Sequence, residues 1–179
     1  MVDYNSAYTG PQIDAAIAKA NTSLQVIDTG WGDYVDTLYT SGSPFLVSAD
    51  TSTVLPNNKG TVIETQKPAD VTTFYNGTTI TGRNGDGLLV TIDALLLPTG
   101  AGTTFVELWF DIGGGFPPLY KRIITFPKGI GVERPLNYTT AAYTLDTWEA
   151  NGATVYIRSD GPVSVYDIRF VITRTHKAV

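Results

Sequence analysis

The chain has 179 residues, of which 42% are hydrophobic, so it can bury one substantial core but has little material for a second large domain. Its formal net charge is −5, with no run of lysine or arginine, which argues against a nucleic-acid partner. It contains no cysteine, which excludes disulfides, thiolate metal sites and cysteine nucleophiles.

The N-terminus shows no targeting signal. The first ten residues have neither the positively charged start nor the apolar stretch of a signal peptide. An apolar run such as residues 94–97 is far too short to span a bilayer. We therefore expect a soluble protein that is made in the cytosol and does not insert into a membrane.

The first predicted element is a helix over residues 9–24. Thr9 at the N-cap and Gln12 three residues later fit a capping box, and Pro11 lies in the first turn, where its missing N–H costs nothing. The apolar positions repeat every three or four residues, in the heptad pattern of a coiled-coil seam: Ile13, Ile17, Ala20 and Leu24.

This seam needs a partner, because a helix of roughly 15 residues is marginal alone in water. The partner is either the domain that follows or other copies of the same helix. Isoleucine at a and d positions favours assemblies of three or more strands. We therefore expect a homotrimer whose seam is formed by Ile13, Ile17, Ala20 and Leu24.

After residue 28 the pattern changes to short extended segments separated by turns rich in asparagine, aspartate and glycine. About eight to ten strands are expected, the number typical of a sandwich or jelly roll. They are centred near Tyr34, Phe45, Val62, Phe74, Leu88, Phe105, Leu119, Ala141, Val155 and Val165. The predicted fold is mainly β: residues 1–28 form an anchor and short helical stem, and residues 29–179 form an antiparallel jelly-roll sandwich.

Three segments predict which strand faces are buried. Residues 104–112 alternate, with Val106, Leu108, Phe110 and Ile112 on one face. Residues 88–97 carry leucines on both faces, as expected for a strand covered by the core on one side and by a subunit contact on the other. In residues 163–173, one predicted stripe is Tyr166, Ile168, Phe170 and Ile172, and the opposite, mixed stripe is Val165, Asp167, Arg169 and Val171.

No catalytic site is predicted. The single histidine, His176, lies in the C-terminal tail, where a fixed catalytic triad is not expected. Glu107 and Asp111 share a strand face but stand about 13 Å apart along it, beyond the separation of a glycosidase pair. A cross-strand pair of Asp93 and Glu107 stays open as an alternative. We expect no enzyme and no cofactor.

Two further sets of polar residues fit turns better than a metal site. Asp33 with Asp36, and Asn84 with Asp86, lack the ligand spacing of a calcium loop. Aspartate and asparagine are common in turns, because their side chains bond the backbone nearby. No metal site is predicted.

Aromatic residues are the remaining candidates for binding, since aromatic rings stack on sugars and bury area at low entropic cost. The candidates for contact with a receptor or glycan are Trp148, Tyr143, Tyr138 and Phe116, with Trp31 beside them. The competing interpretation, that most of them are core or subunit contacts, is the stronger of the two.

Two resemblances to known proteins follow. Residues 8–20, YTGPQIDAAIAKA, resemble the stretch YTG-x-QIDAA-x-x-KA at the start of many small phage fibre and decoration proteins. Residues 31–37, 87–93, 155–160 and 167–172 together resemble the C-terminal trimeric jelly roll of phage virion proteins, which is similar in architecture to tumour necrosis factor.

These resemblances imply a non-enzymatic bacteriophage structural protein, displayed on the virion surface after synthesis in the host cytoplasm. The expected protein is a trimeric head fibre or capsid decoration protein whose N-terminal segment binds other virion proteins. The short stem favours this over the alternative, a tail-fibre receptor-binding or carbohydrate-binding module that recognises a host cell-surface glycan. A glycan hydrolase is a third and weaker alternative.

Overall fold

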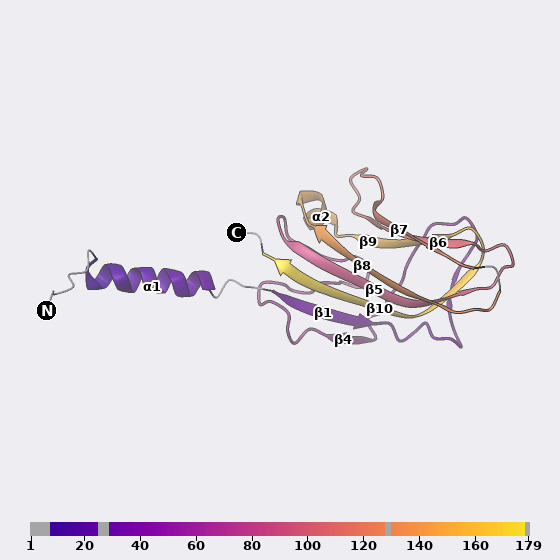
Figure 1. Ribbon diagram of the computed structural model, residues 1–179, viewed down its shortest axis with the longest axis horizontal. Helices are drawn as coiled ribbons and strands as arrows, with labels where there is room; N and C mark the ends of the chain where they lie inside the picture. Colours follow the sequence, from indigo (N-terminus) through magenta and orange to yellow (C-terminus); the bar gives the residue numbers. More distant parts are fainter. Residues whose placement is uncertain (1–7, 25–28, 128–129, 178–179) are drawn as a thin grey trace.

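The computed structural model describes residues 8–24, 29–127 and 130–177. Within them, a helix, α1 (Gly10–Leu24), precedes a β-sandwich and lies apart from it in Figure 1. The helix expected from the sequence is therefore confirmed. Neither this helix nor the short α2 (Asp146–Asn151) is long and apolar enough to cross a membrane.

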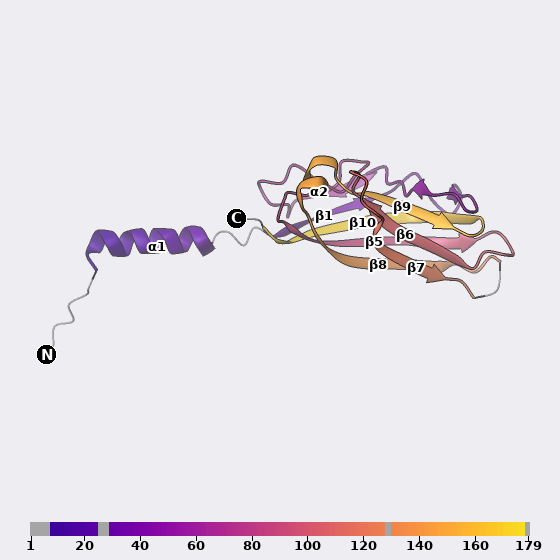
Figure 2. The ribbon, with the colours of Figure 1, turned by 90° about the horizontal axis from the view of Figure 1, so that it is seen from above.

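Ten strands of the described residues form two antiparallel sheets that face each other (Figure 2). The larger sheet has the order β4-β1-β10-β5-β8, with β2 also pairing with β10, and the smaller sheet has the order β3-β9-β6-β7. The strands of the larger sheet are β1 (Gly30–Val35), β2 (Phe45–Val47), β4 (Thr61–Ile63), β5 (Gly87–Pro98), β8 (Arg134–Tyr143) and β10 (Val163–His176). Those of the smaller sheet are β3 (Thr53–Val54), β6 (Phe105–Asp111), β7 (Leu119–Thr125) and β9 (Thr154–Ser159).

The strand order identifies the sandwich as a jelly roll. The chain passes from β5 in the larger sheet to β6 and β7 in the smaller one, returns to the larger sheet at β8, crosses to the smaller sheet for β9 and returns to the larger one at β10. Strands distant in sequence, such as β1 and β10, become neighbours, as in the wound hairpins of a jelly roll. The predicted antiparallel jelly-roll fold is confirmed, while the homotrimer stays a prediction.

The core fills the space between the two sheets. Along β5 every second side chain points inward and is buried: Leu88, Val90, Ile92, Ala94 and Leu96. Residues of β6 and β9 meet them from the other sheet, among them Val106, Leu108, Phe110 and Ile157, so the alternation predicted for residues 104–112 is confirmed. Each large apolar side chain contributes roughly 1.5–3 kcal/mol by leaving water.

The segment near Phe74 is buried but is not a strand. The backbone N–H groups of Phe74 and Tyr75 donate to the hydroxyl of Tyr34, at 2.8 and 3.1 Å. A side chain therefore satisfies donors that a sheet partner would otherwise take. The prediction of a strand at this position was wrong, because a buried loop shows the same local apolar pattern.

A bulge in β10 corrects the predicted stripe of residues 163–173. The register of β10 against β5 shifts between Tyr166 and Arg169, and Asp167 has a φ of +53°. One extra residue in a strand turns the side chains that precede it to the opposite face of the sheet. Val165 therefore packs between the sheets, and Tyr166 is buried on the outer face opposite Leu95. Ile168, Phe170 and Ile172 face inward as predicted.

Candidate functional site

The exposed face of α1 is the first candidate interaction surface. Gln12 Oε1 accepts a hydrogen bond from the Thr9 backbone N–H at 2.9 Å, as a capping box requires. Ile13 and Ile17 are 41% and 53% exposed, and Ala20 is exposed as well. A shallow groove runs beside them along the same helix face. The side chain of Leu24, the fourth predicted seam residue, lies outside the described ones.

The second candidate is the outer face of the six-stranded sheet, the side turned away from the core. The strand register aligns Thr173, Leu89 and Ala141 in one row, and Val171, Thr91 and Thr139 in the next. Further apolar side chains on this face are Leu46, Leu95 and Leu97. Leu46 is 69% exposed and Leu89 is 38% exposed, so the single chain leaves this face largely uncovered.

A charged row crosses the middle of this outer face. Arg169 on β10 donates from Nε and Nη2 to the carboxylate of Asp33 on β1, at 2.8 and 2.6 Å. Arg169 also lies opposite Asp93 on β5, which accepts from the Asn137 amide at 2.6 Å. The predicted mixed stripe of Arg169 and Val171 does face outward. The row places fixed charges within a surface that is otherwise apolar and rich in threonine.

The outer face of the four-stranded sheet is partly covered by its own side chains. Trp109 and Tyr156 stack with ring centroids 5.7 Å apart, and the Lys121 ammonium lies 5.4 Å from the Trp109 centroid. Lys121 and Arg158 pair with Glu107 at 3.1 and 3.2 Å. Burial raises the pKa of Glu107, but these two cations outweigh it and lower that pKa overall.

These pairings argue against hydrolytic chemistry at the acidic residues considered from the sequence. Glu107 lies on the smaller sheet and Asp93 on the outer face of the larger one, so the core separates them and they cannot form a pair. Asp36 accepts backbone N–H groups of Leu38, Tyr39 and Asn58 at 2.8, 2.7 and 2.6 Å, which makes it a loop-fixing residue. Among the described residues, no cluster of three or more His, Asp or Glu could hold a metal ion.

The four aromatic candidates differ in exposure, since two are buried and two are exposed. Trp148 is 2% exposed and donates from Nε1 to the Ile80 carbonyl at 3.0 Å, and Tyr138, 8% exposed, donates its hydroxyl to the Tyr120 carbonyl. Both are core residues and are not available to a ligand. Tyr143 and Phe116 are 63% and 53% exposed. Of the four, only these two are open to a partner.

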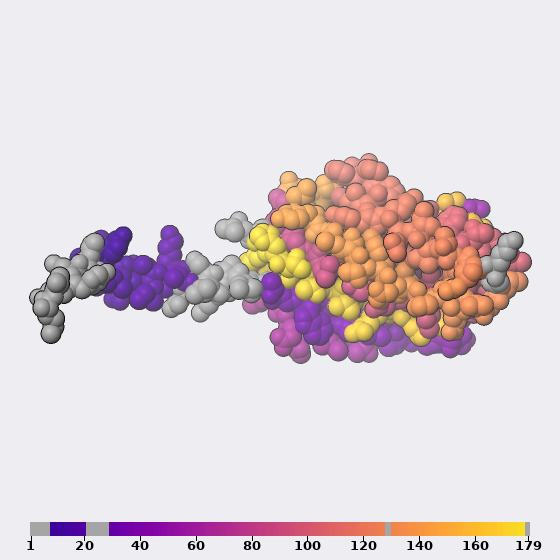
Figure 3. All heavy atoms as spheres, in the orientation of Figure 1, coloured from indigo at the N-terminus to yellow at the C-terminus, as the bar shows by residue number. Residues whose placement is uncertain are grey.

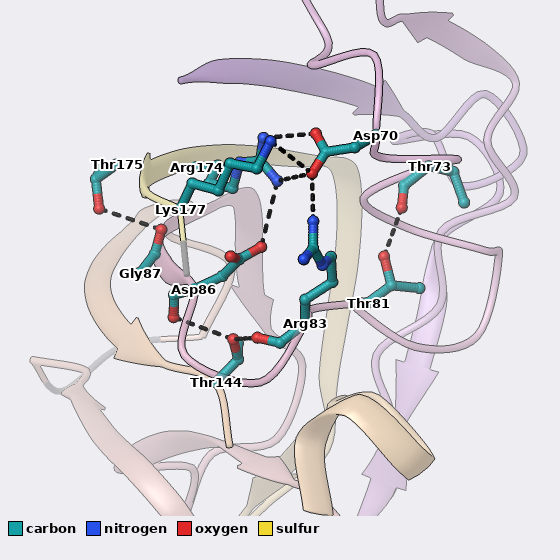
Figure 4. Close-up of polar contacts among 10 residues, drawn as sticks. All are labelled: Asp70, Thr73, Thr81, Arg83, Asp86, Gly87, Thr144, Arg174, Thr175 and Lys177. Atoms are coloured by element: carbon teal, nitrogen blue, oxygen red, sulfur yellow. Dashed lines mark hydrogen bonds and ion pairs between the residues drawn. The ribbon is translucent and has the colours of Figure 1, made fainter. Parts of the chain in front are cut away.

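A polar cluster at one end of the sandwich was not anticipated from the sequence (Figure 4). Arg174, near the end of β10, is fully buried and donates to Asp70 at 2.7 and 3.1 Å and to Asp86 at 3.4 Å. Arg83 and Lys177 also pair with Asp70. A signal was present, because the inward stripe of Phe170 and Ile172 continues to Arg174. A pocket of about 270 Å³ opens beside this cluster.

No protein-family model matches the chain, and no curated protein sequence matches it. Among solved structures, the vertex protein P5 of PRD1 is similar at 13% identity and a TM-score of 0.42, covering 84% of this chain and 73% of its own. The Eiger TNF of S. frugiperda is similar at 12% identity and a TM-score of 0.48, over 85% and 96%. An empty virus-like particle of cowpea mosaic virus is similar at 12% identity and a TM-score of 0.26, over 84% and 79%. The fold assignment rests on the strand order, and these likenesses add no functional argument.

Proposed function

We propose that this chain is a non-enzymatic structural protein of a bacteriophage particle, a trimeric head fibre or capsid decoration protein displayed on the virion surface. In this proposal, the segment up to residue 28 binds other virion proteins, and the jelly roll projects outward. The chain binds neither nucleic acid nor membrane and needs no cofactor or metal.

The exposed isoleucines of α1 carry this proposal. Ile13 and Ile17 stand on one face of a capped helix and remain exposed in the single chain. Burying such a side chain contributes a free energy of roughly 1.5–3 kcal/mol, which an exposed side chain does not provide. Their spacing fits a seam between copies, and the same residues lie within the stretch that resembles the start of phage fibre and decoration proteins.

The outer face of the six-stranded sheet gives independent support for assembly. Its leucines and threonines form a broad surface with few charges, and in the central Arg169–Asp33 pair the arginine is half exposed and the carboxylate is buried. An apolar surface with fixed charges within it favours one docking register over others. A copy that covers this face would bury Leu46 and Leu89, two of the apolar groups exposed there.

Sedimentation equilibrium tests the assembly. We expect the intact chain to have three times the monomer mass, and the double variant Ile13→Asp, Ile17→Asp to dissociate at concentrations where the intact chain does not. The matched control is Ala15→Asp, Ala18→Asp, which adds the same charge away from the helix face of Ile13 and Ile17 and should stay trimeric. A monomeric intact chain across micromolar concentrations would contradict the proposal.

Particle location needs a separate test. Antibodies against residues 29–179 should label the surface of purified, intact phage particles in negatively stained micrographs. Labelling on the head supports the decoration or head-fibre assignment, and labelling at the tail tip supports the alternative. Detection in infected cells but not in purified particles would contradict both.

The alternative, a receptor-binding or carbohydrate-binding tail module for host adsorption, is favoured by the exposure of Tyr143 and Phe116. A glycan array of host surface sugars separates it from a purely structural role. Saturable binding that Tyr143→Ala or Phe116→Ala abolishes, without a change in thermal midpoint, would support adsorption. An array without binding leaves the structural assignment as the one supported.

A further inference from the structure

We infer that the pocket beside Arg83 binds a small monocarboxylate with an apolar body, such as a short branched or aromatic acid. The pocket has a volume of about 270 Å³ and opens at the end of the sandwich where β5 begins and β10 ends. Drug-sized ligands occupy roughly 300–1,000 Å³, so the occupant is smaller than these. This inference stands apart from the assembly proposed above.

The lining is mainly apolar, with donors at the rim. Val71, Phe74 and Leu88 supply apolar surface, and Arg83 and Thr72 contribute polar groups. Arg83 uses Nη1 to pair with Asp70. No described residue accepts a hydrogen bond from its Nε or Nη2, and its side chain is 45% exposed. A guanidinium with two unused donors matches the two oxygens of a carboxylate.

The charge of the ion-paired cluster beside the pocket also favours an anion. Asp70 and Asp86 bring two negative charges, against the three positive charges of Arg83, Arg174 and Lys177 (Figure 4). Both oxygens of Asp70 already accept from these cations. The surrounding acids are therefore compensated, although the whole chain carries a net charge of −5.

The pairing of Asp70 with these cations also disfavours a neutral sugar as the ligand of the pocket. A sugar brings several hydroxyl donors, which need acceptors once they leave water. The carboxylate oxygens of Asp70 are occupied, and the Thr73 carbonyl accepts from the Thr81 hydroxyl. A monocarboxylate presents acceptors only, so the free donors of Arg83 and the apolar lining suit it better.

An NMR titration of the intact chain with isovalerate tests this inference. We expect saturable shifts of the backbone amides of Thr72, Thr73 and Arg83, and none with isovaleramide, which has the same shape without the charge. Arg83→Gln should weaken isovalerate binding by about tenfold or more, the effect of losing hydrogen bonds to a charged group. Arg122→Gln, at an exposed arginine on β7, is the matched control and should leave binding unchanged.

A second variant guards against a folding defect in the first. Thr72→Phe fills the mouth of the pocket while it keeps every charge, and should abolish binding without moving the thermal midpoint. The inference fails if isovalerate, 3-phenylpropionate and acetate all give no saturable shift. It also fails if isovaleramide binds equally well, if Arg83→Gln binds as tightly as the parent chain, or if glucose binds instead.

Discussion

The position of Arg174 in the sequence predicts an apolar core residue, whereas the structure shows a buried ion pair there. Arg174 continues the inward stripe of Phe170 and Ile172, yet it carries a guanidinium into a position that is fully buried. Such a charge is tolerated only where partners replace its water. Asp70 and Asp86 supply them from segments 104 and 88 residues away in sequence. That separation explains why the local pattern, which indicated an inward position for Arg174, did not identify its partners.

We predict that Asp70→Asn destabilises the domain by about 3 kcal/mol at pH 7, because it removes the carboxylate charge to which the buried Arg174 donates at 2.7 and 3.1 Å. Urea denaturation of the parent and the variant measures the difference. Asp50→Asn is the control, since it removes the exposed partner of Arg158 and should cost no more than about 1 kcal/mol. Equal effects of the two substitutions would contradict the structural role of Asp70.

The Asp70–Arg174 pair also predicts how the stability of the domain depends on pH. Hydrogen bonds from Arg174 hold the pKa of Asp70 well below its ordinary value. A carboxyl group with a lowered pKa in the folded state contributes stability above its unfolded pKa of about 3.9 and loses it as the pH falls further. Urea midpoints should therefore drop more steeply below about pH 4 in the parent than in Asp70→Asn. Parallel pH profiles would refute this.

A substitution of Trp148 tests whether this residue belongs to the core or serves as a contact for a ligand. Its ring is buried and its Nε1 bonds the Ile80 carbonyl, so Trp148→Ala should destabilise the domain by about 3–5 kcal/mol. Tyr143→Ala, at an exposed aromatic, should stay within about 0.5 kcal/mol of the parent. Differential scanning calorimetry compares the two variants with the parent. A Trp148→Ala protein as stable as the parent would show that Trp148 does not stabilise the core.

At the scale of elements, local determinants explain which predictions succeeded. The helix of residues 9–24 depends on neighbours three and four positions apart, and the half of its capping box in which Gln12 accepts from the Thr9 backbone N–H forms as expected. The alternation of β6 is equally local. The segment at Phe74 depends instead on the hydroxyl of Tyr34, 40 residues earlier, so the same apolar pattern became a buried loop.

The bulge in β10 gives a prediction at this scale. Asp167 has a φ of +53°, a region that glycine adopts freely and that β-branched residues strongly disfavour. We expect Asp167→Val to destabilise the domain by about 1–2 kcal/mol and Asp167→Gly to stay within about 1 kcal/mol of the parent. Chemical denaturation checks this order. A reversed order would indicate that the side chain of Asp167, not its backbone, matters there.

At the scale of the whole molecule, the core of the sandwich is buried, whereas α1 and the outer face of the larger sheet are exposed to solvent. If these surfaces meet other copies, folding and association are linked, and stability depends on concentration. The midpoint of thermal unfolding should then rise as the protein is concentrated from micromolar to hundreds of micromolar. The Ile13→Asp, Ile17→Asp variant should show a smaller rise, and an invariant midpoint in the parent would contradict linked assembly.

The sequence by itself determined the helix, the all-β character of the domain and the inward face of β6, because periodicity and turn chemistry are properties of neighbouring residues. Only the tertiary structure decided that Trp148 and Tyr138 are core residues, that Val165 faces inward beyond a bulge, and that Asp70 and Asp86 meet Arg174. Those outcomes depend on contacts between distant segments, and such contacts leave no mark in the spacing of neighbouring residues.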